Sequence, residues 1–317
     1  MTRRDPRTGA TKAMEFTERW AAGKPLLLDG ALGTEIERRG GDAGLPLWSA
    51  RALCDDPALV AQIHRDYVTA GAEVVVANTF RTQARTLAHG GLADRAAELT
   101  RDAAWLARDA TARAPGPCWV AGSAPTLEDC YRPDLVPDEA SLAREHGEHA
   151  ANLAAAGVDV VFAETLNTVR EARAALRAAH EAGLPAIASF VCDGSARLLS
   201  GEPLAAAVEA AAGEGAIGVG VNCLPARAAR ACLPTLTASG LPFLVYANLG
   251  EPTEGGAFRS SDELSPDAFA READAWLEAG AHAVGGCCGT TPGHLAAIER
   301  LVSIRRGPRT QFASPRA

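Results

Sequence analysis

The chain has few of the features that would place it in a membrane, outside the cell or on nucleic acid. Its 317 residues contain no uninterrupted apolar run of about eighteen residues, and the first stretch, MTRRDPRTGATK, has no apolar run of signal-peptide length. The formal net charge is -8 and the basic residues are interspersed with acids, so no basic stripe is available to displace counterions from a polyanion. We therefore expect a cytoplasmic protein that binds neither nucleic acid nor membranes.

The sequence also lacks the pattern of a disulfide framework. Its eight cysteines are irregularly spaced and no secretion signal precedes them, so reduced thiols are expected. Cys287 and Cys288 are adjacent, and a disulfide between neighbours would close a strained ring. No C-x-x-C motif is present, which argues against a thioredoxin-like redox pair. The adjacent cysteines therefore need another explanation.

Eight short apolar runs alternate with segments of helical length. The runs are near-continuous Val, Ile, Leu and Ala, which is typical of strands buried on both faces of a parallel sheet. Several of the intervening segments end on Gly, where a left-handed helix cap carries little strain. The predicted strands are 25–29, 72–78, 118–122, 158–164, 185–190, 216–222, 242–247 and 281–286. The predicted helices are 58–70, 94–112, 138–156, 168–182, 203–212, 226–238, 266–279 and 293–304.

Eight strand–helix units favour an α/β fold of one type, the (β/α)8 TIM barrel, over an open sheet, because such barrels occupy about 250 residues. We predict a single barrel domain over residues 23–304, a disordered N-terminal segment over 1–22 and a flexible tail over 305–317. His146 and His149 are interpreted as helix-surface residues, and Trp105 and Trp276 as side chains that pack helices onto the barrel.

The candidate chemistry follows the predicted strands. Active sites of barrels form at the carboxyl ends of the strands and in the loops after them. The residues in these positions are Asp29, Gly30 and Ala31 after the first strand, Thr79 after the second, Glu164 at the end of the fourth, Asn222 and Cys223 at the end of the sixth, and Cys287 and Cys288 after the eighth. All of them are expected on one rim of the barrel.

Three of these residues form a candidate metal site. The sixth and eighth strands have one strand between them, so Cys223 can converge with Cys287 and Cys288. Three thiolates with an open fourth position suit a catalytic zinc ion, which would deprotonate a bound thiol near neutral pH. Gly285, Gly286 and Gly289 would allow adjacent side chains to point at one ion. The remaining cysteines are interpreted as small buried hydrophobes.

At these residues the sequence resembles a known family. The strings LLLDGALGTEIERRG, GVNC and GGCCGTTP resemble the homocysteine-binding domain of homocysteine S-methyltransferases, including the S-methylmethionine-dependent branch, betaine-homocysteine methyltransferase and the amino-terminal module of cobalamin-dependent methionine synthase. The resemblance runs from about Pro25 to Ile304. It implies a (β/α)8 barrel whose Zn2+ is held by cysteines at the positions of Cys223, Cys287 and Cys288.

The resemblance further implies which groups bind homocysteine. Asp29 and the backbone N–H groups around Gly30 and Ala31 match the segment that receives the amino-acid end, and such a turn can offer N–H donors to a carboxylate. Glu164 matches the acid that pairs with the substrate ammonium, a cation that a carboxylate inside a site requires. Thr79 and Asn222 are candidates either to line the site or merely to satisfy backbone groups.

The donor is expected to be a sulfonium. The chain stops at Ala317 without folate or cobalamin modules, and it has no D-x-H-x-x-G string for a cobalamin-ligating histidine. It has three tyrosines, and Thr165 stands where betaine users carry an aromatic residue for the quaternary ammonium. The strings LWSA, ETL and VYANLGE resemble the S-methylmethionine branch, which in some members also accepts S-adenosylmethionine. The expected product is methionine, in methionine biosynthesis.

Three alternatives stay open. The same chemistry could act on selenohomocysteine or another small thiol or selenol. A zinc hydrolase is disfavoured, because three thiolates make a poor Lewis acid for water and no H-E-x-x-H motif is present. The third alternative is a homocysteine or zinc sensor without enzymatic activity. The sequence does not define an oligomeric state.

Overall fold

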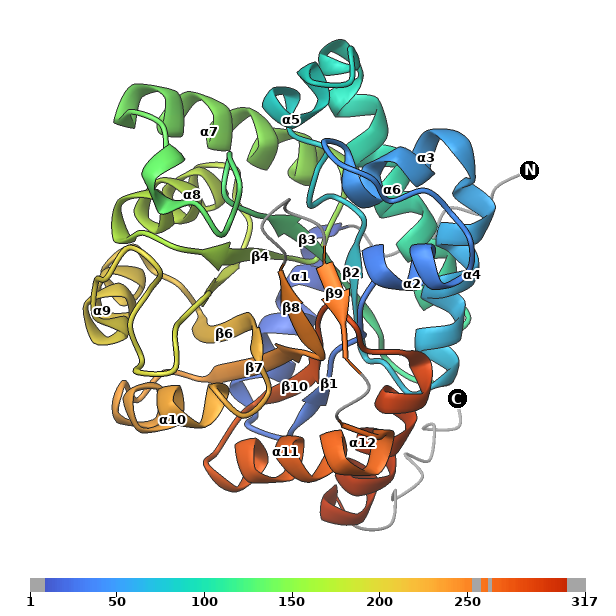
Figure 1. Ribbon diagram of the computed structural model, residues 1–317, viewed down its shortest axis with the longest axis vertical. Helices are drawn as coiled ribbons and strands as arrows, with labels where there is room; N and C mark the ends of the chain where they lie inside the picture. Colours follow the sequence, from blue (N-terminus) through green and yellow to red (C-terminus); the bar gives the residue numbers. More distant parts are fainter. Residues whose placement is uncertain (1–8, 253–257, 262–263, 307–317) are drawn as a thin grey trace, which may run out of the picture.

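A closed barrel of eight parallel strands forms the centre of the computed structural model, which describes residues 9–252, 258–261 and 264–306 (Figure 1). The barrel strands are β1 (Leu26–Leu27), β2 (Val74–Ala77), β3 (Trp119–Ala124), β4 (Val160–Leu166), β5 (Ala186–Phe190), β6 (Gly218–Pro225), β7 (Phe243–Asn248) and β10 (Ala283–Gly286). Their order in the sheet is β1-β10-β7-β6-β5-β4-β3-β2, and a parallel bridge between Leu28 and Val74 joins its two ends. The predicted TIM barrel is confirmed.

A ring of helices surrounds the barrel (Figure 1). The helices that follow barrel strands are α4 (Pro57–Thr69), α6 (Ala96–Thr111), α7 (Glu139–Ala156), α8 (Val169–Glu181), α9 (Leu204–Gly213), α10 (Ala229–Ala238), α11 (Pro266–Glu278) and α12 (Pro292–Arg306). Side-chain caps begin several of them, as where Ser265 accepts a hydrogen bond from the Ala268 N–H and Pro266 takes the first helical position. All eight predicted helices are present.

Short elements occupy the loops on the carboxyl-terminal rim. They are α2 (Gly33–Arg38), α3 (Arg51–Asp55), α5 (Ala84–Ala88) and the 3-10 turns η1 (Trp48–Ala50), η2 (Ala93–Arg95) and η3 (Pro133–Leu135). A two-stranded hairpin, β8 (Gly250–Pro252) and β9 (Phe258–Ser260), follows β7 and lies in front of the barrel strands in Figure 1. These insertions build walls around the rim where the candidate residues lie.

The N-terminal segment differs from the disordered segment predicted over 1–22. Residues Gly9–Ala21 form helix α1, which lies behind the barrel strands in Figure 1. Phe16 and Trp20 are buried, and the Trp20 Nε1–H donates a hydrogen bond to the Ile217 carbonyl over 2.8 Å. The open lower end of a barrel exposes apolar side chains, and α1 covers them. Residues 1–8 and 307–317 of the predicted ends lie outside the described residues.

Two predictions about single side chains are wrong. His146 and His149 were expected on a helix surface, but each is 2% exposed, because α7 packs His149 against β3 and His146 against α8. Trp105, expected to pack onto the barrel, is 59% exposed on the outer face of α6. Trp276 is fully buried against Phe269, as predicted.

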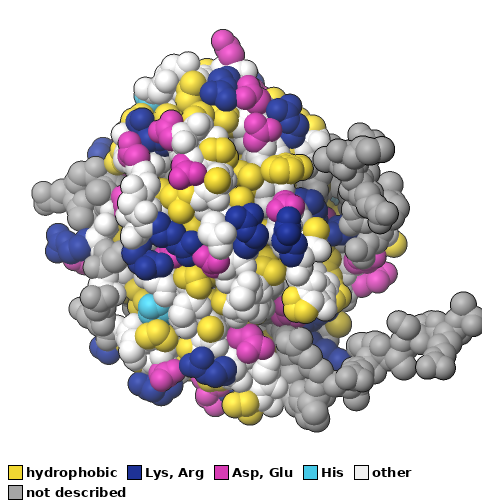
Figure 2. Space-filling model, turned by 90° about the vertical axis from the view of Figure 1, so that its right-hand side faces the viewer, with side chains coloured by type: hydrophobic (Ala, Val, Ile, Leu, Met, Phe, Trp, Pro, Cys, Tyr) yellow, Lys and Arg dark blue, Asp and Glu magenta, His cyan; other side chains and the backbone are white. Residues whose placement is uncertain are grey.

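The surface carries charges of both signs. Figure 2, which views the right-hand side of Figure 1, shows Lys and Arg side chains interspersed with Asp and Glu and no continuous basic patch on that face. None of the helices in the described part of the chain is long and apolar enough to span a membrane.

We predict that Trp20→Ala lowers the free energy of unfolding by about 3–5 kcal/mol, because it empties a fully packed site and leaves the Ile217 carbonyl unpaired. Urea unfolding followed by circular dichroism measures the loss. Trp105→Ala is the matched control and should change stability by no more than about 0.5 kcal/mol. Equal losses in the two variants would show that α1 is not part of the cooperative fold.

Candidate active site

Three cysteine thiols converge on the carboxyl-terminal rim. Cys223 lies near the end of β6, and Cys287 and Cys288 directly follow β10. Their sulfur atoms all lie within 4.8 Å of one another, and the Sγ atoms of Cys223 and Cys287 are 2.9 Å apart, longer than the roughly 2.05 Å of a disulfide. Two thiolates bound 2.3 Å from a tetrahedral zinc ion would lie roughly 3.8 Å apart. The spacing and the soft donor set therefore fit one such ion.

The backbone bends at the strand end that carries Cys223. Cys223 has φ 54° and Thr165, near the end of β4, has φ 59°, both in the left-handed region that side chains rarely adopt. Each lies at a shift in strand register, and the Thr165 Oγ1 is 3.7 Å from the Cys223 Sγ. Such conformations cost about 1–3 kcal/mol each, so the surrounding structure must hold them. The strain is concentrated beside the thiol cluster.

Gly285 has a packing role that differs from the predicted one. A Cβ built on Gly285 would lie 2.8 Å from the Asp29 carbonyl oxygen and 2.7 Å from the Leu28 Cβ. The absence of a side chain therefore lets β10 approach the end of β1 closely. This contact places Asp29 beside the strand that leads into the two adjacent cysteines.

Burial and mutual contacts affect the protonation of the thiols. A hydrogen bond with Cys287, together with burial, raises the pKa of Cys223 well above the ordinary value for cysteine, and a hydrogen bond with Cys223, together with burial, does the same for Cys288. Three negative sulfurs at this spacing would repel one another strongly without a cation between them. The cluster is thus suited to bind a metal ion and poorly suited to act as three free thiolates.

Two buried carboxylates face the same cavity as the thiols. Glu164 accepts hydrogen bonds from the Ser123 hydroxyl, from the Tyr246 hydroxyl over 2.7 Å and from the Asn222 amide over 3.3 Å. Asp29 accepts one from the Val76 N–H over 2.9 Å. Burial raises the pKa of both groups, and the charge of Glu164 raises that of Asp29 further. Among the described residues no Lys or Arg forms an ion pair with either, so a cationic ligand group is the natural partner.

The cavity has a volume of about 320 Å³ and brings together most of the predicted site residues. Asp29, Gly30, Ala31, Glu164 and the three cysteines all line it. The Ala31 N–H already donates to the Thr290 Oγ1 over 3.1 Å, whereas the Gly30 N–H has no hydrogen-bond partner among the described residues. Gly30 is therefore the better placed donor for a substrate carboxylate.

Thr79 and Asn222 lie behind the cavity wall. The Thr79 hydroxyl donates to the Ser123 carbonyl over 2.9 Å and accepts from the Ser123 N–H over 2.8 Å. The Asn222 amide bonds Glu164 and, over 2.8 Å, the Thr165 hydroxyl. Both residues position groups that reach the cavity and do not line it themselves.

Several cavity residues were not singled out from the sequence. Ser123 and Tyr246 stand in or after predicted strands, and their position at the rim was a usable signal. Tyr131, whose hydroxyl donates to the Cys223 carbonyl over 3.3 Å, lies in an irregular loop after β3 that no periodicity marks. The remaining aromatic and basic lining residues come from similar loops, namely Trp48, Phe80, Arg81, His89 and Phe258.

The chain is similar in fold and in sequence to known proteins. The family model for homocysteine S-methyltransferases matches residues 26–302. The homocysteine S-methyltransferase of Escherichia coli (strain K12) is 33% identical, over 86% of this chain and 94% of its own, and a selenocysteine Se-methyltransferase of Brassica oleracea var. italica is 30% identical, over 94% and 96%. The crystal structure of the homocysteine methyltransferase MmuM from E. coli in its metallated form superposes with a TM-score of 0.77 at 31% identity, covering 88% of this chain and 96% of that one.

The family match and these relatives, together with a TIM barrel whose carboxyl-terminal rim carries three cysteines that could hold a metal ion, define the class of the protein as an enzyme, a methyltransferase. The chain belongs to the homocysteine S-methyltransferase family. This excludes the interpretation as a sensor without activity and gives no support to a hydrolase.

Loss of a residue that only supports a metal ligand lowers metal affinity by about 10- to 100-fold. We predict a larger loss of zinc affinity in Cys287→Ala, because one of the three thiol ligands themselves is removed. Metal analysis after dialysis measures the zinc content, expected at one ion per wild-type chain, and circular dichroism should show an intact barrel. The control is Cys54→Ala on α3, an exposed thiol remote from the cluster. Full zinc occupancy in Cys287→Ala would remove Cys287 from the ligand set.

Glu164→Gln should raise the KM for homocysteine by a factor equivalent to about 2 kcal/mol or more, because a buried charge-assisted contact is lost.

The same substitution should change stability. Since the pKa of Glu164 is raised in the folded state, the contribution of this carboxyl group to stability falls as pH rises through that pKa. The glutamine variant escapes this loss, so without ligand it should melt at the same or a higher temperature than wild type at pH 7, with the gap shrinking in acid. Glu209→Gln, exposed on α9, should change neither quantity. Unchanged homocysteine binding in Glu164→Gln would place the substrate ammonium elsewhere.

Proposed function

We propose that the protein transfers a methyl group from a sulfonium donor, S-methylmethionine or S-adenosylmethionine, to homocysteine, with Zn2+ held by Cys223, Cys287 and Cys288. The observation that carries this proposal is the shared cavity, in which a cluster of three thiols lies beside two buried carboxylates that have no cationic partner among the described residues. An amino acid that bears a thiol presents both the ammonium and the sulfur that such a cavity requires. Homocysteine fits this description.

The acceptor would be oriented by residues of β1 and β4. Asp29 and Glu164 would bind its ammonium, and the Gly30 N–H would bind its carboxylate. Ser123, Tyr246 and Asn222 hold Glu164 by hydrogen bonds, so the carboxylate does not need to reorganise when substrate enters. Fixing the amino-acid end in this way leaves the side chain of homocysteine to reach toward the cysteines.

The chemistry is a direct displacement. A bound zinc ion would promote deprotonation of the homocysteine thiol near neutral pH, with release of the proton to solvent. The homocysteine sulfur then attacks the methyl carbon of the donor, a new S–CH3 bond forms, and the old bond breaks with its electron pair returning to the donor sulfur. That sulfur leaves as a neutral thioether. No general acid is needed, and positioning in the cavity supplies most of the catalysis.

The cavity wall suits a cationic methyl group. The chain as a whole is poor in aromatic residues, but Trp48, Phe80, Tyr131, Tyr246 and Phe258 all line this cavity. Aromatic faces attract sulfonium and quaternary ammonium groups alike. The preference for a sulfonium therefore depends on the strings that resemble the S-methylmethionine branch and on the uncharged leaving group.

A second acceptor class is favoured by one observation. The Brassica oleracea relative, at 30% identity, is a selenocysteine Se-methyltransferase. Asp29 and Glu164 would recognise an α-amino acid without discriminating sulfur from selenium. Selenohomocysteine and selenocysteine are therefore the alternative acceptors.

The test uses zinc-loaded protein and 13C-labelled homocysteine, because with S-methylmethionine both products are methionine and only the label identifies the methylated acceptor. Mass spectrometry should detect labelled methionine with S-methylmethionine, slower formation with S-adenosylmethionine, and none with betaine or methylcobalamin. Selenohomocysteine and selenocysteine are offered in parallel. Preference for betaine over both sulfoniums would overturn the donor assignment, and methylation of a selenol but not of homocysteine would overturn the acceptor.

A further inference from the structure

Arg81 is a cation in the cavity that has no anionic partner among the described residues. It lies four residues after β2 and lines the same cavity as the cysteine cluster. Its guanidinium forms no hydrogen bond or ion pair with any described residue, and its Nε is buried. Like Arg81, Arg227 and Arg271 form no ion pair with a described residue, but solvent can hydrate both of them because they are exposed. A part-buried arginine without a partner calls for a ligand.

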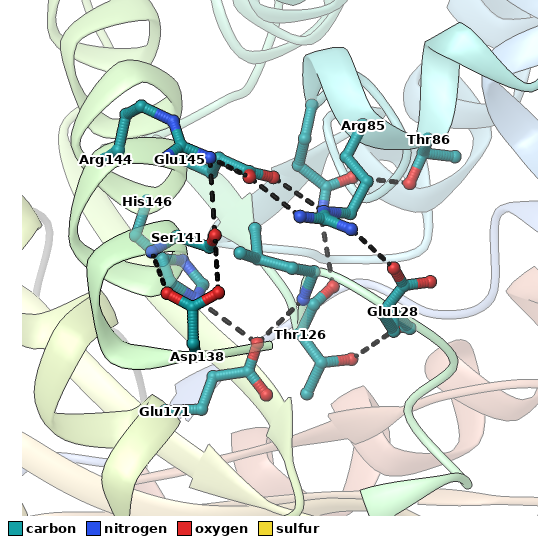
Figure 3. Close-up of polar contacts among 12 residues, drawn as sticks. Arg85, Thr86, Thr126, Glu128, Asp138, Ser141, Arg144, Glu145, His146 and Glu171 are labelled. Carbon is teal, nitrogen blue, oxygen red and sulfur yellow. Dashed lines mark hydrogen bonds and ion pairs between the residues drawn. The ribbon is translucent and has the colours of Figure 1, made fainter. Parts of the chain in front are cut away.

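Arg85, four residues further along the chain, shows what a satisfied arginine looks like in this region (Figure 3). Its guanidinium bonds both carboxylate oxygens of Glu145, over 2.6 and 2.8 Å, and one oxygen of Glu128, over 2.8 Å. Glu128 lines the cavity, so one acid of the loop after β3 is already paired with Arg85. Arg85 also fastens the loop after β3 to α7 and so fixes the wall that faces Arg81.

The other acids of the cavity do not pair with Arg81 either. The Asp129 Oδ1 accepts a hydrogen bond from the Tyr131 N–H over 2.9 Å within its own turn. Asp29 and Glu164 form no ion pair with Arg81, and the charge of Arg81 acts instead on Cys130, where it opposes the burial that raises the pKa of that thiol to about 12. Arg81 therefore lines the cavity together with Cys130 of the loop after β3 and is not paired with the carboxylates assigned to the acceptor.

The Arg81 guanidinium is also held in place. Its Cζ lies 5.3 Å from the centroid of the Phe80 ring, a cation–π contact that restricts the group without using any of its N–H donors. A planar guanidinium with free N–H groups can bind a carboxylate through two parallel hydrogen bonds. The geometry thus presents a fixed anion receptor on the cavity wall.

We infer that Arg81 binds the α-carboxylate of the methyl donor, which makes the site selective for sulfonium donors that are amino acids. The inference rests on the proposed function: two amino-acid substrates bring two carboxylates into one cavity. The Gly30 N–H serves the carboxylate of the acceptor, and Arg81 serves that of the donor. S-Methylmethionine and S-adenosylmethionine share this carboxylate, whereas a simple trialkylsulfonium lacks it. Arg81 is a specificity-determining residue that does not touch the reacting atoms.

The test compares S-methylmethionine with its carboxamide, which keeps the sulfonium and the ammonium but removes the carboxylate charge. Wild type should show a KM about 10- to 100-fold higher for the amide, the range that a charge-assisted contact provides. Arg81→Ala should raise the KM for S-methylmethionine by about the same factor, leave the KM for the amide nearly unchanged and leave the KM for homocysteine unchanged. Arg81→Lys should retain part of the preference. Arg101→Ala, which removes an exposed arginine from α6, is the matched control and should behave as wild type.

The other outcomes overturn the inference in distinguishable ways. An equal rise in KM for acid and amide in Arg81→Ala would show a structural role, and a rise confined to homocysteine would assign Arg81 to the acceptor. If wild type forms no methionine from any sulfonium, the proposed function fails, and calorimetric titration of S-methylmethionine and its amide into wild type and Arg81→Ala then tests the inference alone. Absence of an Arg81-dependent preference in that titration would overturn it.

Discussion

Three sulfur atoms from two strand ends can lie within 4.8 Å of one another only if β6, β10 and the strand β7 between them keep their register. β6 and β10 both pair with β7, with Gly220 opposite Leu244 and Val284 opposite Val245. A slip of one residue in either ladder would turn Cys223 or Cys287 to the other face of the barrel. The buried Val, Leu and Ala side chains of these strands fix the register, so the hydrophobic core determines the geometry of the metal site.

The residues around the cysteines make the folded protein less stable than it could be. Asp29 and Glu164 are buried acids without a cationic partner among the described residues, and Cys223 and Thr165 hold left-handed backbone conformations. Each of these features costs free energy in folding, and all of them lie in or beside the cavity where the proposed ligands would bind. Substrate and metal would supply the missing charges. The stability that the barrel core provides is what permits such a site.

The strands and helices of the barrel could be predicted from the sequence, because they follow from its pattern of apolar residues. All eight strands and their following helices were located, because continuous apolar runs mark strands covered on both faces and Gly or Ser marks helix ends. The cysteines and Glu164 were found because barrel sites form at strand ends. Tyr131 and Arg81 were missed, since they lie in loops whose conformation depends on distant contacts. Helix α1 was taken for disorder because its buried aromatic residues have partners far along the chain: Phe16 packs against Trp119, and Trp20 bonds the Ile217 carbonyl.

That separation has a consequence for how the chain is made. Trp20 leaves the ribosome 197 residues before Ile217, whose carbonyl it contacts, and earlier still than His282, whose ring it contacts. Strand β1 likewise waits for β10 before its second edge is paired. During translation the nascent chain therefore exposes an aromatic helix and an open sheet edge, the surfaces that chaperones bind and that aggregate when left uncovered. Emergence of the segment that carries His282 and β10 from the ribosome is the event that ends this exposure.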